Sequence, residues 1–289
     1  MSSREQTLSP PAAGLSGLAG SRMAEIEAQR DSTPLNTPLN TPLEQTRWRQ
    51  RVELAAAYRA VDHFGWTEQI YAHLTARVPG TDDHFLINPW GLNYDEITAS
   101  NLVEIDLEGR VVDGRDASTI NYAGFVIHSA LHMIKGSEHH VVMHTHTTAG
   151  MAVAALQGGL LPVSMFATAF HGRLAYHDYE GAALYLDERE RLVASLGSAK
   201  AMILRNHGLM AVGRTVAECF LRLYRLERAC QVQIAAAAAG PLRLLPDALA
   251  AKSGADLDAY QGLHPGGEGA IEFEALMRKL DRKDKGYRI

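Results

Sequence analysis

Short strand-like segments alternate with helical segments along most of this chain, and that alternation restricts the fold to the α/β class. Apolar residues recur with helical spacing in residues 49–64, 122–134 and 216–239. Between these stretches lie short runs rich in Val, Ile and Leu, which we predict to be strands: residues 70–77, 84–87, 102–106, 139–145 and a strand–turn–strand within 201–212. We therefore expect one α/β domain over residues 47–245.

The two ends of the chain differ in composition from this domain. Residues 1–46 are rich in Ser, Pro and Gln and contain three repeats that begin at Thr33, Thr37 and Thr41, each reading Thr-Pro-Leu-Asn or Thr-Pro-Leu-Glu. Proline lacks the amide hydrogen and blocks helix interiors, so we predict a disordered N-terminal tail over residues 1–46 and leave open a role in docking. Residues 246–289 are predicted to form a C-terminal extension with one amphipathic helix, residues 271–280.

Charge and cysteine usage limit the partners and the compartment. The chain has 28 Lys and Arg against 33 Asp and Glu, a net charge of −5, which argues against nucleic acid or an anionic membrane as partner. Cys219 and Cys230 lie on one predicted helix, roughly 16 Å apart, which is too far for a disulfide.

No apolar run reaches the roughly 18 residues of a spanning helix, and the first 30 residues lack the apolar core of a signal peptide. We expect a soluble cytoplasmic protein.

Histidines provide the clearest chemical signal. His144 and His146 are two apart at the end of a predicted strand, where side chains i and i+2 share one face and can bind a common metal ion at about 2.1 Å. The same spacing also occurs in two unconnected surface histidines. His207 lies at the tip of a predicted hairpin, in a tight turn that Gly208 would permit. His207 is either a third ligand or a turn residue bonded to backbone, and spacing alone leaves both open.

Several segments occur in the same order as motifs of one known family. They are residues 71–77, 85–91, 94–98, 123–128, 143–150, 176–181 and 203–213. With these segments, residues 48–240 resemble the class II aldolase/adducin family, which includes fuculose-phosphate aldolase and ribulose-phosphate epimerase. The resemblance implies a three-layer α/β/α fold around a largely antiparallel central sheet.

The resemblance also implies a metal site and an assembly. In this family the matching histidines hold a divalent metal, so His144, His146 and His207 are expected to hold one ion per subunit. Zinc is the first expectation, and iron, manganese or cobalt also suit imidazole ligands. The family implies a small-molecule substrate and a homo-oligomer, a tetramer with active sites near the subunit borders.

The chain departs from the pattern of the family's sugar-phosphate aldolases in two places. Those enzymes carry an acid/base Glu just before the helix that precedes the His-x-His strand, whereas residues 120–125 here contain no carboxylate. Tyr122, Asn121 or a bound water are the candidates to transfer the proton. The phosphate pocket is also altered, because Trp90 and the Asn121-Tyr122 pair replace small and hydroxyl residues. This favours a different substrate, one that is aromatic or carries a carboxylate.

Further substrate-binding candidates come from the same segments. Trp90 suits either a substrate contact or packing of its amphipathic ring over the core. His128 and His132 are four apart on one helix face, and His128 is the better candidate for a contact next to the metal. The predicted substrate-binding residues are Trp90, His73, Thr75, His128 and His171.

The leading functional hypothesis is a metal-dependent lyase that cleaves a C–C bond, by an aldol-type reaction or decarboxylation, in a small oxo or hydroxy acid or a sugar-derived substrate. One alternative is a non-haem Fe(II) oxygenase that cleaves an aromatic oxo acid, as in some relatives. The other is a non-catalytic, adducin-like assembly module. A complete set of three histidines argues for the enzyme, because a scaffold has no physical need for it.

Overall fold

The computed structural model describes residues 41–115, 120–136, 138–182 and 185–289. The helices are α2 (Pro42–His63), α3 (Tyr122–His132), α4 (Thr148–Ala154), α5 (Met165–Thr168), α6 (Glu188–Leu196), α7 (Val216–Ala239), α8 (Asp247–Gly262) and α9 (Ala270–Asp281), with short 3-10 turns η1 (Tyr94–Glu96) and η3 (Gly286–Arg288). The strands are β1 (His73–Arg77), β2 (His84–Ile87), β3 (Val103–Asp106), β4 (Val141–Thr145), β5 (Leu174–His177), β6 (Ala201–Leu204) and β7 (Gly208–Gly213). Every predicted strand and helix named above is present, with ends shifted by a few residues.

The strands form one seven-stranded sheet in the order β3-β2-β1-β4-β7-β6-β5. All neighbouring pairs are antiparallel except β5 and β6, which run parallel. The prediction of a largely antiparallel central sheet is therefore confirmed. The register places His73 of β1 opposite His144 of β4, in the middle of the sheet.

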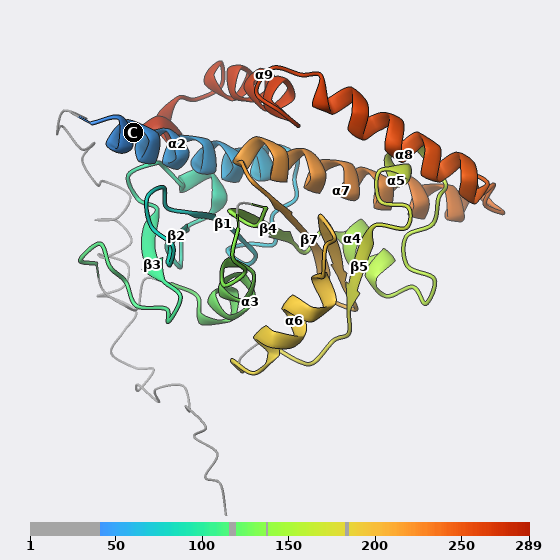
Figure 1. The fold of residues 1–289 in the computed structure, drawn as a ribbon, viewed down its shortest axis with the longest axis horizontal. Coiled ribbons are helices and arrows are strands. Elements are labelled where there is room, and N and C mark those ends of the chain that lie inside the picture. Colours follow the sequence, from blue (N-terminus) through green and yellow to red (C-terminus); the bar gives the residue numbers. More distant parts are fainter. Residues whose placement is uncertain (1–40, 116–119, 137, 183–184) are drawn as a thin grey trace, which may run out of the picture. The chain divides into compact units, whose positions relative to one another are not determined.

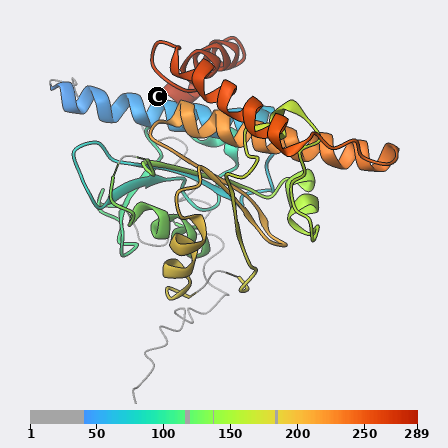
Figure 2. The same cartoon turned by 45° about the vertical axis from the view of Figure 1, so that its right-hand side comes forward.

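Helices cover both faces of this sheet (Figure 1). On one face α2 and α7 lie side by side, with α4 and α5 packed against α7; on the other face α3 packs against α6. The turned view shows the same two layers of helix with the sheet between them (Figure 2). This arrangement agrees with the predicted three-layer architecture, and α9 adds a further layer outside α2 and α7.

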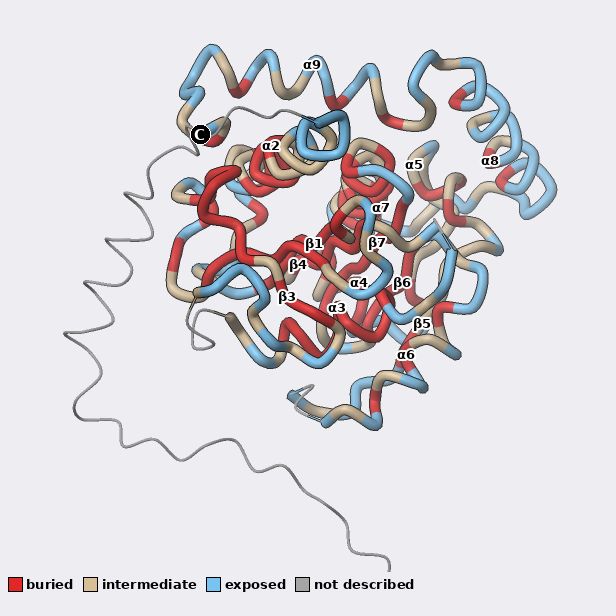
Figure 3. The backbone as a smooth tube through the Cα atoms, turned by 60° about the vertical axis from the view of Figure 1, so that its left-hand side comes forward, coloured by how far each residue is buried: buried red, intermediate tan, exposed pale blue. Residues whose placement is uncertain are grey.

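The two-sided cover explains the sequence of the central strands. All residues of β4, β6 and β7 are buried, and these strands are apolar along their length because each face meets a helix layer (Figure 3). One apolar cluster joins α3 and α6 to β4, β6 and β7, and a second joins α3 to β2 and β3. The few polar residues in these strands, among them His144, therefore need a specific reason to be there.

The structure corrects both ends of the predicted domain. Helix α2 begins at Pro42, inside the predicted tail, because Thr41 caps it: the Thr41 hydroxyl accepts the Glu44 amide and the Glu44 carboxylate accepts the Thr41 amide. Proline suits the first turn of a helix, where its missing amide has no partner to lose. The rest of the tail, residues 1–40, lies outside the described residues. The C-terminal extension contains two helices, α8 and α9, where one was predicted.

The two cysteines are free and buried, as their spacing on one helix predicts. Within the described residues, none of the helices combines the length and the apolar character that crossing a bilayer requires.

Candidate metal centre

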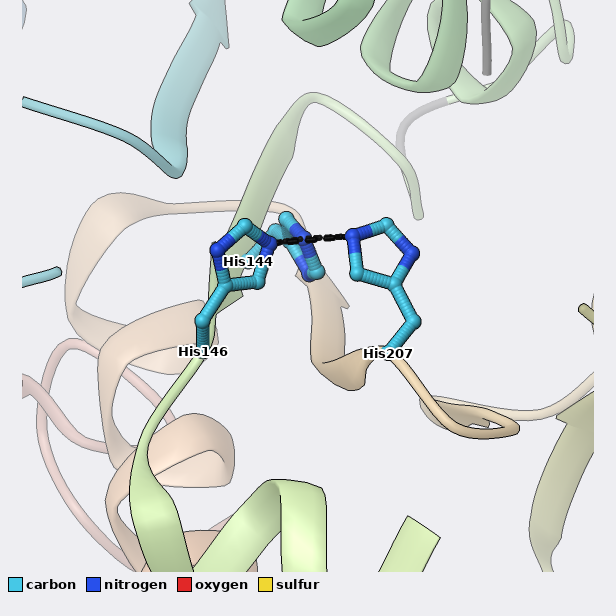
Figure 4. A group of neighbouring side chains, drawn as sticks. All are labelled: His144, His146 and His207. Carbon is cyan, nitrogen blue, oxygen red and sulfur yellow. Dashed lines mark hydrogen bonds between the residues drawn. The ribbon is translucent and has the colours of Figure 1, made fainter. Parts of the chain in front are cut away.

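Three imidazole rings converge at one end of the sheet (Figure 4). His144 is in β4, His146 follows the end of β4, and His207 lies in the turn between β6 and β7. Strand β7 is the neighbour of β4 in the sheet. The Nε2 atom of His144 lies 2.7 Å from that of His146 and 3.3 Å from that of His207, and His146 and His207 are separated by 3.0 Å. The structure thus brings together the three residues that the sequence predicts as ligands.

Backbone contacts fix the rings in this arrangement. His144 Nδ1 donates to the carbonyl of Leu209 at 2.8 Å, so its Nε2 carries the lone pair that faces the other two rings. Gly208 is required for a reason that differs from the predicted one. It has no positive φ; instead, a Cβ there would lie 2.4 Å from the Thr145 carbonyl oxygen and 3.2 Å from both the His144 and His146 rings. The positive φ of the turn, 55°, belongs to Asn206.

The environment keeps all three rings neutral. Burial, reinforced by the other two rings, holds the pKa of His144 well below its usual range, and burial together with His146 lowers the pKa of His207 to about 4. The pKa of His146 is lowered by burial and partly restored by the charge of Glu68. Neutral imidazole is the form that binds metals. Nitrogens around a tetrahedral ion at 2.0–2.1 Å are about 3.3 Å apart, so the histidine triangle fits a divalent cation after a small outward movement.

A cavity of 320 Å³ opens over the three histidines. It is lined by Tyr71, Ala72, His73, Asn121, Ala123, Gly124, Ile127, Met151, Tyr179, Gly181, Ala182 and Asn206 in addition to the three ligand candidates. Among the described residues that line it, none is Asp, Glu, Lys or Arg. This agrees with the absence of a carboxylate from residues 120–125; the nearby Glu68, whose charge acts on His146, is not among the lining residues.

His73 occupies the wall of this cavity in a defined orientation. Asn121 caps α3 by accepting the amide of Ala123 through Oδ1, so its Nδ2 faces and donates to His73 Nε2 at 3.1 Å. His73 Nδ1 therefore carries the hydrogen and donates to Asn88 Oδ1 at 3.0 Å. Burial lowers the pKa of His73 to about 4, so the ring is neutral at pH 7. Two of the predicted residues, His73 and Asn121, thus lie beside the histidine triangle.

Thr75 and His128 lie behind the cavity and do not line it. The Thr75 hydroxyl is 2.8 Å from both His128 Nδ1 and His132 Nε2, between β1 and α3. His128 is fully buried, with its ring centroid 6.5 Å from that of His144. These residues support the strand that carries His73, and their position gives them no direct contact with a ligand in the cavity.

Trp90, Tyr122 and His171 are placed away from the cavity as well. The Trp90 ring packs against that of Tyr71, with centroids 5.6 Å apart, and Tyr71 in turn lines the cavity. Tyr122 is 45% exposed and its ring contacts Phe125. His171 lies 3.6 Å from a carboxylate oxygen of Asp247.

Two tyrosines that the sequence did not single out border the site. Tyr179 faces His207 with ring centroids 6.4 Å apart, and Tyr71 is held over the cavity by a strained turn, in which Gln69 and Ala72 have φ of 52° and 68°. Positive φ in residues other than glycine is uncommon and often occurs at functional sites. Tyr179 falls in residues 176–181, one of the segments that carries the family resemblance, so that segment held the signal.

Helix α7 contacts the segment that carries His146. The hydroxyl of Thr147, the residue after His146, donates to the buried carboxylate of Glu227, which also accepts from Gln231 at 2.7 Å. Thr147 accepts the amide of Gly150 and so caps α4. Burial raises the pKa of Glu227. This contact anchors the segment between β4 and α4 that carries His146.

Comparison with known proteins agrees with this fold and site. Residues 52–234 match the family described as Class II Aldolase and Adducin N-terminal domain. The crystal structure of an aldolase II superfamily protein from Pseudomonas syringae is 49% identical, with a TM-score of 0.78 over 86% of this chain and 97% of that one. The L-fuculose 1-phosphate aldolase from Glaciozyma antarctica PI12 is 28% identical, with a TM-score of 0.73 over 91% of this chain and 99% of that one.

Adducins are similar to the same region. Alpha-adducin from Rattus norvegicus is 44% identical over 251 residues, which are 82% of this chain and 33% of the adducin. The family match extends over more than half of the chain, and the order of the motifs, the sheet and the histidine cluster are all consistent with it. The chain belongs to the class II aldolase and adducin family.

Proposed function

We propose that this protein is a metal-dependent lyase that cleaves a C–C bond in a small oxo or hydroxy acid. The observation that carries the proposal is the convergence of His144, His146 and His207 in a cavity, with all three rings held neutral. Neutral imidazole rings at these separations can each offer one nitrogen lone pair to a cation held between them. A divalent ion held there supplies positive charge that binds substrate oxygens and stabilises the negative charge developing during C–C cleavage.

The lining of the cavity supports the substrate class. None of the described lining residues carries a charge, so nothing there offers a phosphate group a salt bridge. The carboxylate of an oxo or hydroxy acid would take the cation itself as its partner. We therefore favour a carboxylate-bearing or sugar-derived substrate without a phosphate.

The chain's own polar groups orient the substrate. Asn121 lies in the cavity wall, where one hydrogen of its Nδ2 is donated to His73 Nε2 and the second is available to a substrate. An amide does not titrate near neutral pH, so Asn121 acts by hydrogen bonding and not, as the sequence suggested, by proton transfer. Tyr71 and Tyr179 line the sides of the cavity.

The first test is the metal content of protein purified without chelator or an affinity metal. Wild type is expected to hold one divalent ion per chain, and His207→Ala is expected to lose most of it, because a three-ligand site loses one of its ligands. The matched control is His171→Ala, which removes a turn histidine outside the cluster and should leave the metal content unchanged. Elemental analysis measures all three proteins.

The outcomes separate the candidate functions. Zinc, manganese or cobalt in wild type supports the lyase, with zinc as the first expectation. Iron would instead favour an oxygenase. Equal metal content in wild type and His207→Ala would reject the ligand assignment, and a metal-free wild type would favour the non-catalytic assembly module that adducin similarity suggests.

We also propose that the chain forms a homotetramer. The proposal is supported by the family and by the exposed aromatic rings around the cavity, since Tyr71 and Tyr179 are 47% and 58% exposed. Light scattering on the purified protein should give about four times the mass of the 31.5 kDa chain. A mass equal to one chain at micromolar concentration would contradict it.

A further inference from the structure

A second cavity lies at the opposite end of the sheet from the histidines. It has a volume of 390 Å³ and is bordered by the starts of β5 and β6, by the end of α6 and by α7. Strands β5 and β6 run parallel, and both begin at this cavity. At their other ends the chain continues to Tyr179 and His207, so the two cavities are connected by the same pair of strands.

The second cavity is rich in positive charge, in contrast to the first. Four of its lining residues are basic and two are acidic: Arg173, Lys200, Arg222, Arg225, Asp258 and Glu268. Two of the basic groups are fully engaged. Arg173 pairs with Asp258 and donates to the Ala169 carbonyl, while Arg222 pairs with Glu218 and Glu268 and donates to the Val212 carbonyl.

The other two basic groups lack hydrogen-bond partners within the described part of the chain. Arg225 has a side chain only 13% exposed, yet its contact with Glu268 is an ion pair of 3.6 Å to Oε1, with no hydrogen bond, while Oε2 of the same carboxylate accepts two bonds from Arg222. The side-chain ammonium of Lys200, just before β6, makes no hydrogen bond or ion pair with the described residues, whereas its backbone carbonyl accepts the Val212 amide. A guanidinium has five donors and is costly to bury without acceptors, so Arg225 has capacity for a further anion.

From these contacts we infer that the cavity is a binding site for a phosphate group, held by Arg225 and Lys200 at the starts of β5 and β6. Arg225 offers a planar pair of donors and Lys200 a point charge, the combination that suits a doubly charged oxyanion. The inference is independent of the chemistry proposed at the histidines.

Titration calorimetry tests the site with the full-length protein and inorganic phosphate at constant ionic strength in chloride. Wild type should bind phosphate saturably. Arg225→Gln and Lys200→Gln should each weaken binding by about tenfold or more, because each removes a charge-assisted hydrogen bond. The matched controls are Arg278→Gln and Lys252→Gln, which remove exposed basic groups that pair with Glu274 and Asp256 outside the cavity, and both should bind as wild type does.

A second probe, glycerol 3-phosphate, distinguishes the source of the phosphate group. Tighter binding of the ester assigns the site to a phosphorylated small molecule, and tighter binding of inorganic phosphate assigns it to the free ion. Lys200 is exposed, so its variant keeps the test valid if Arg225→Gln fails to fold.

Three results would overturn the inference. One is unchanged phosphate affinity in both cavity variants. Another is loss of phosphate binding in His207→Ala but not in Arg225→Gln, which would place the ion at the histidines. The third is a fall in oligomer mass in Arg225→Gln, which would show that Arg225 pairs with a second copy of the chain.

Discussion

Single residues decide how the cavity above the histidines is built. A Cβ at Gly124 would lie 1.8 Å from His73 Cδ2 and 2.1 Å from His73 Nε2. The imidazole of β1 therefore occupies the space that a side chain on the first turn of α3 would need. The His73 ring and a side chain at position 124 therefore exclude each other.

This interlock leads to a prediction. Gly124→Ala must displace the His73 ring and should lower the free energy of unfolding by about 1–3 kcal/mol. In the double variant with His73→Ala the methyl group has room, so the two losses should not add. Urea unfolding of wild type, Gly124→Ala, His73→Ala and the double variant measures the coupling energy between the two positions. Gly262→Ala is the control, since a Cβ there meets nothing within 4 Å, and additive losses at Gly124 and His73 would contradict the interlock.

At the scale of elements, the contact between β1 and α3 is made of polar groups. Thr75 of β1 joins His128 and His132 of α3, and His132 stacks on Phe85 with ring centroids 4.5 Å apart. Burial, with a smaller contribution from the charge of Arg77, lowers the pKa of His132 to about 3. The strand that carries His73 is thus held to the helix by side chains that must stay neutral.

Acid should therefore weaken this contact. The unfolded chain binds a proton at His132 below a pH of about 6.5, whereas the folded protein does so only near pH 3, so stability is lost as the pH falls between these values. His132→Leu should reduce the slope of unfolding free energy against pH by up to about 1.4 kcal/mol per unit between pH 6 and 4. Urea unfolding in EDTA removes any contribution from metal loss. Above pH 7 both proteins should show the same slope, and parallel curves throughout would reject the assignment.

At the scale of the whole described chain, the C-terminal residues pack against α2 and the loop around Ala99. The amides of Ala99 and Ser100 donate to the carbonyls of Tyr287 and Ile289, and Arg59 of α2 pairs with Asp284 (Figure 1). The Tyr287 side chain is fully buried and its hydroxyl donates to Asp281 at 2.7 Å. The C-terminal extension is therefore part of the packed unit.

Truncating this anchor should be costly. Tyr287→Ala removes a buried aromatic ring and a hydrogen bond, and should lower the free energy of unfolding by about 3–5 kcal/mol. Tyr260→Ala, at a tyrosine 59% exposed on α8, should change it by less than about 0.5 kcal/mol. Chemical denaturation compares the two. Equal, small losses would mean that the C-terminal residues add little to the stability of the fold.

Much of the architecture was predictable from local pattern. The strands β2, β4, β6 and β7 and the long helix α7 are continuous apolar or helically periodic runs, so their residues alone identify them. Helix α8 has only three buried residues and no apolar stripe, and the strand β5 is half-buried at the edge of the sheet; neither carries a local signal. The boundary at Pro42 was missed because a proline in the first turn looks like a breaker until its cap is recognised.

The candidate metal centre, too, could be predicted from the sequence only in part. The sequence by itself determined that His144 and His146 share a face and that His207 sits at a hairpin tip, because strand period and turn chemistry are local properties. Tertiary structure alone decided that His73 fills the space beside Gly124, that Trp90 turns to Tyr71, and that Arg225 is buried without a hydrogen bond. Each of those outcomes depends on side chains that are distant along the chain and meet only when the sheet has formed, so no local pattern records them.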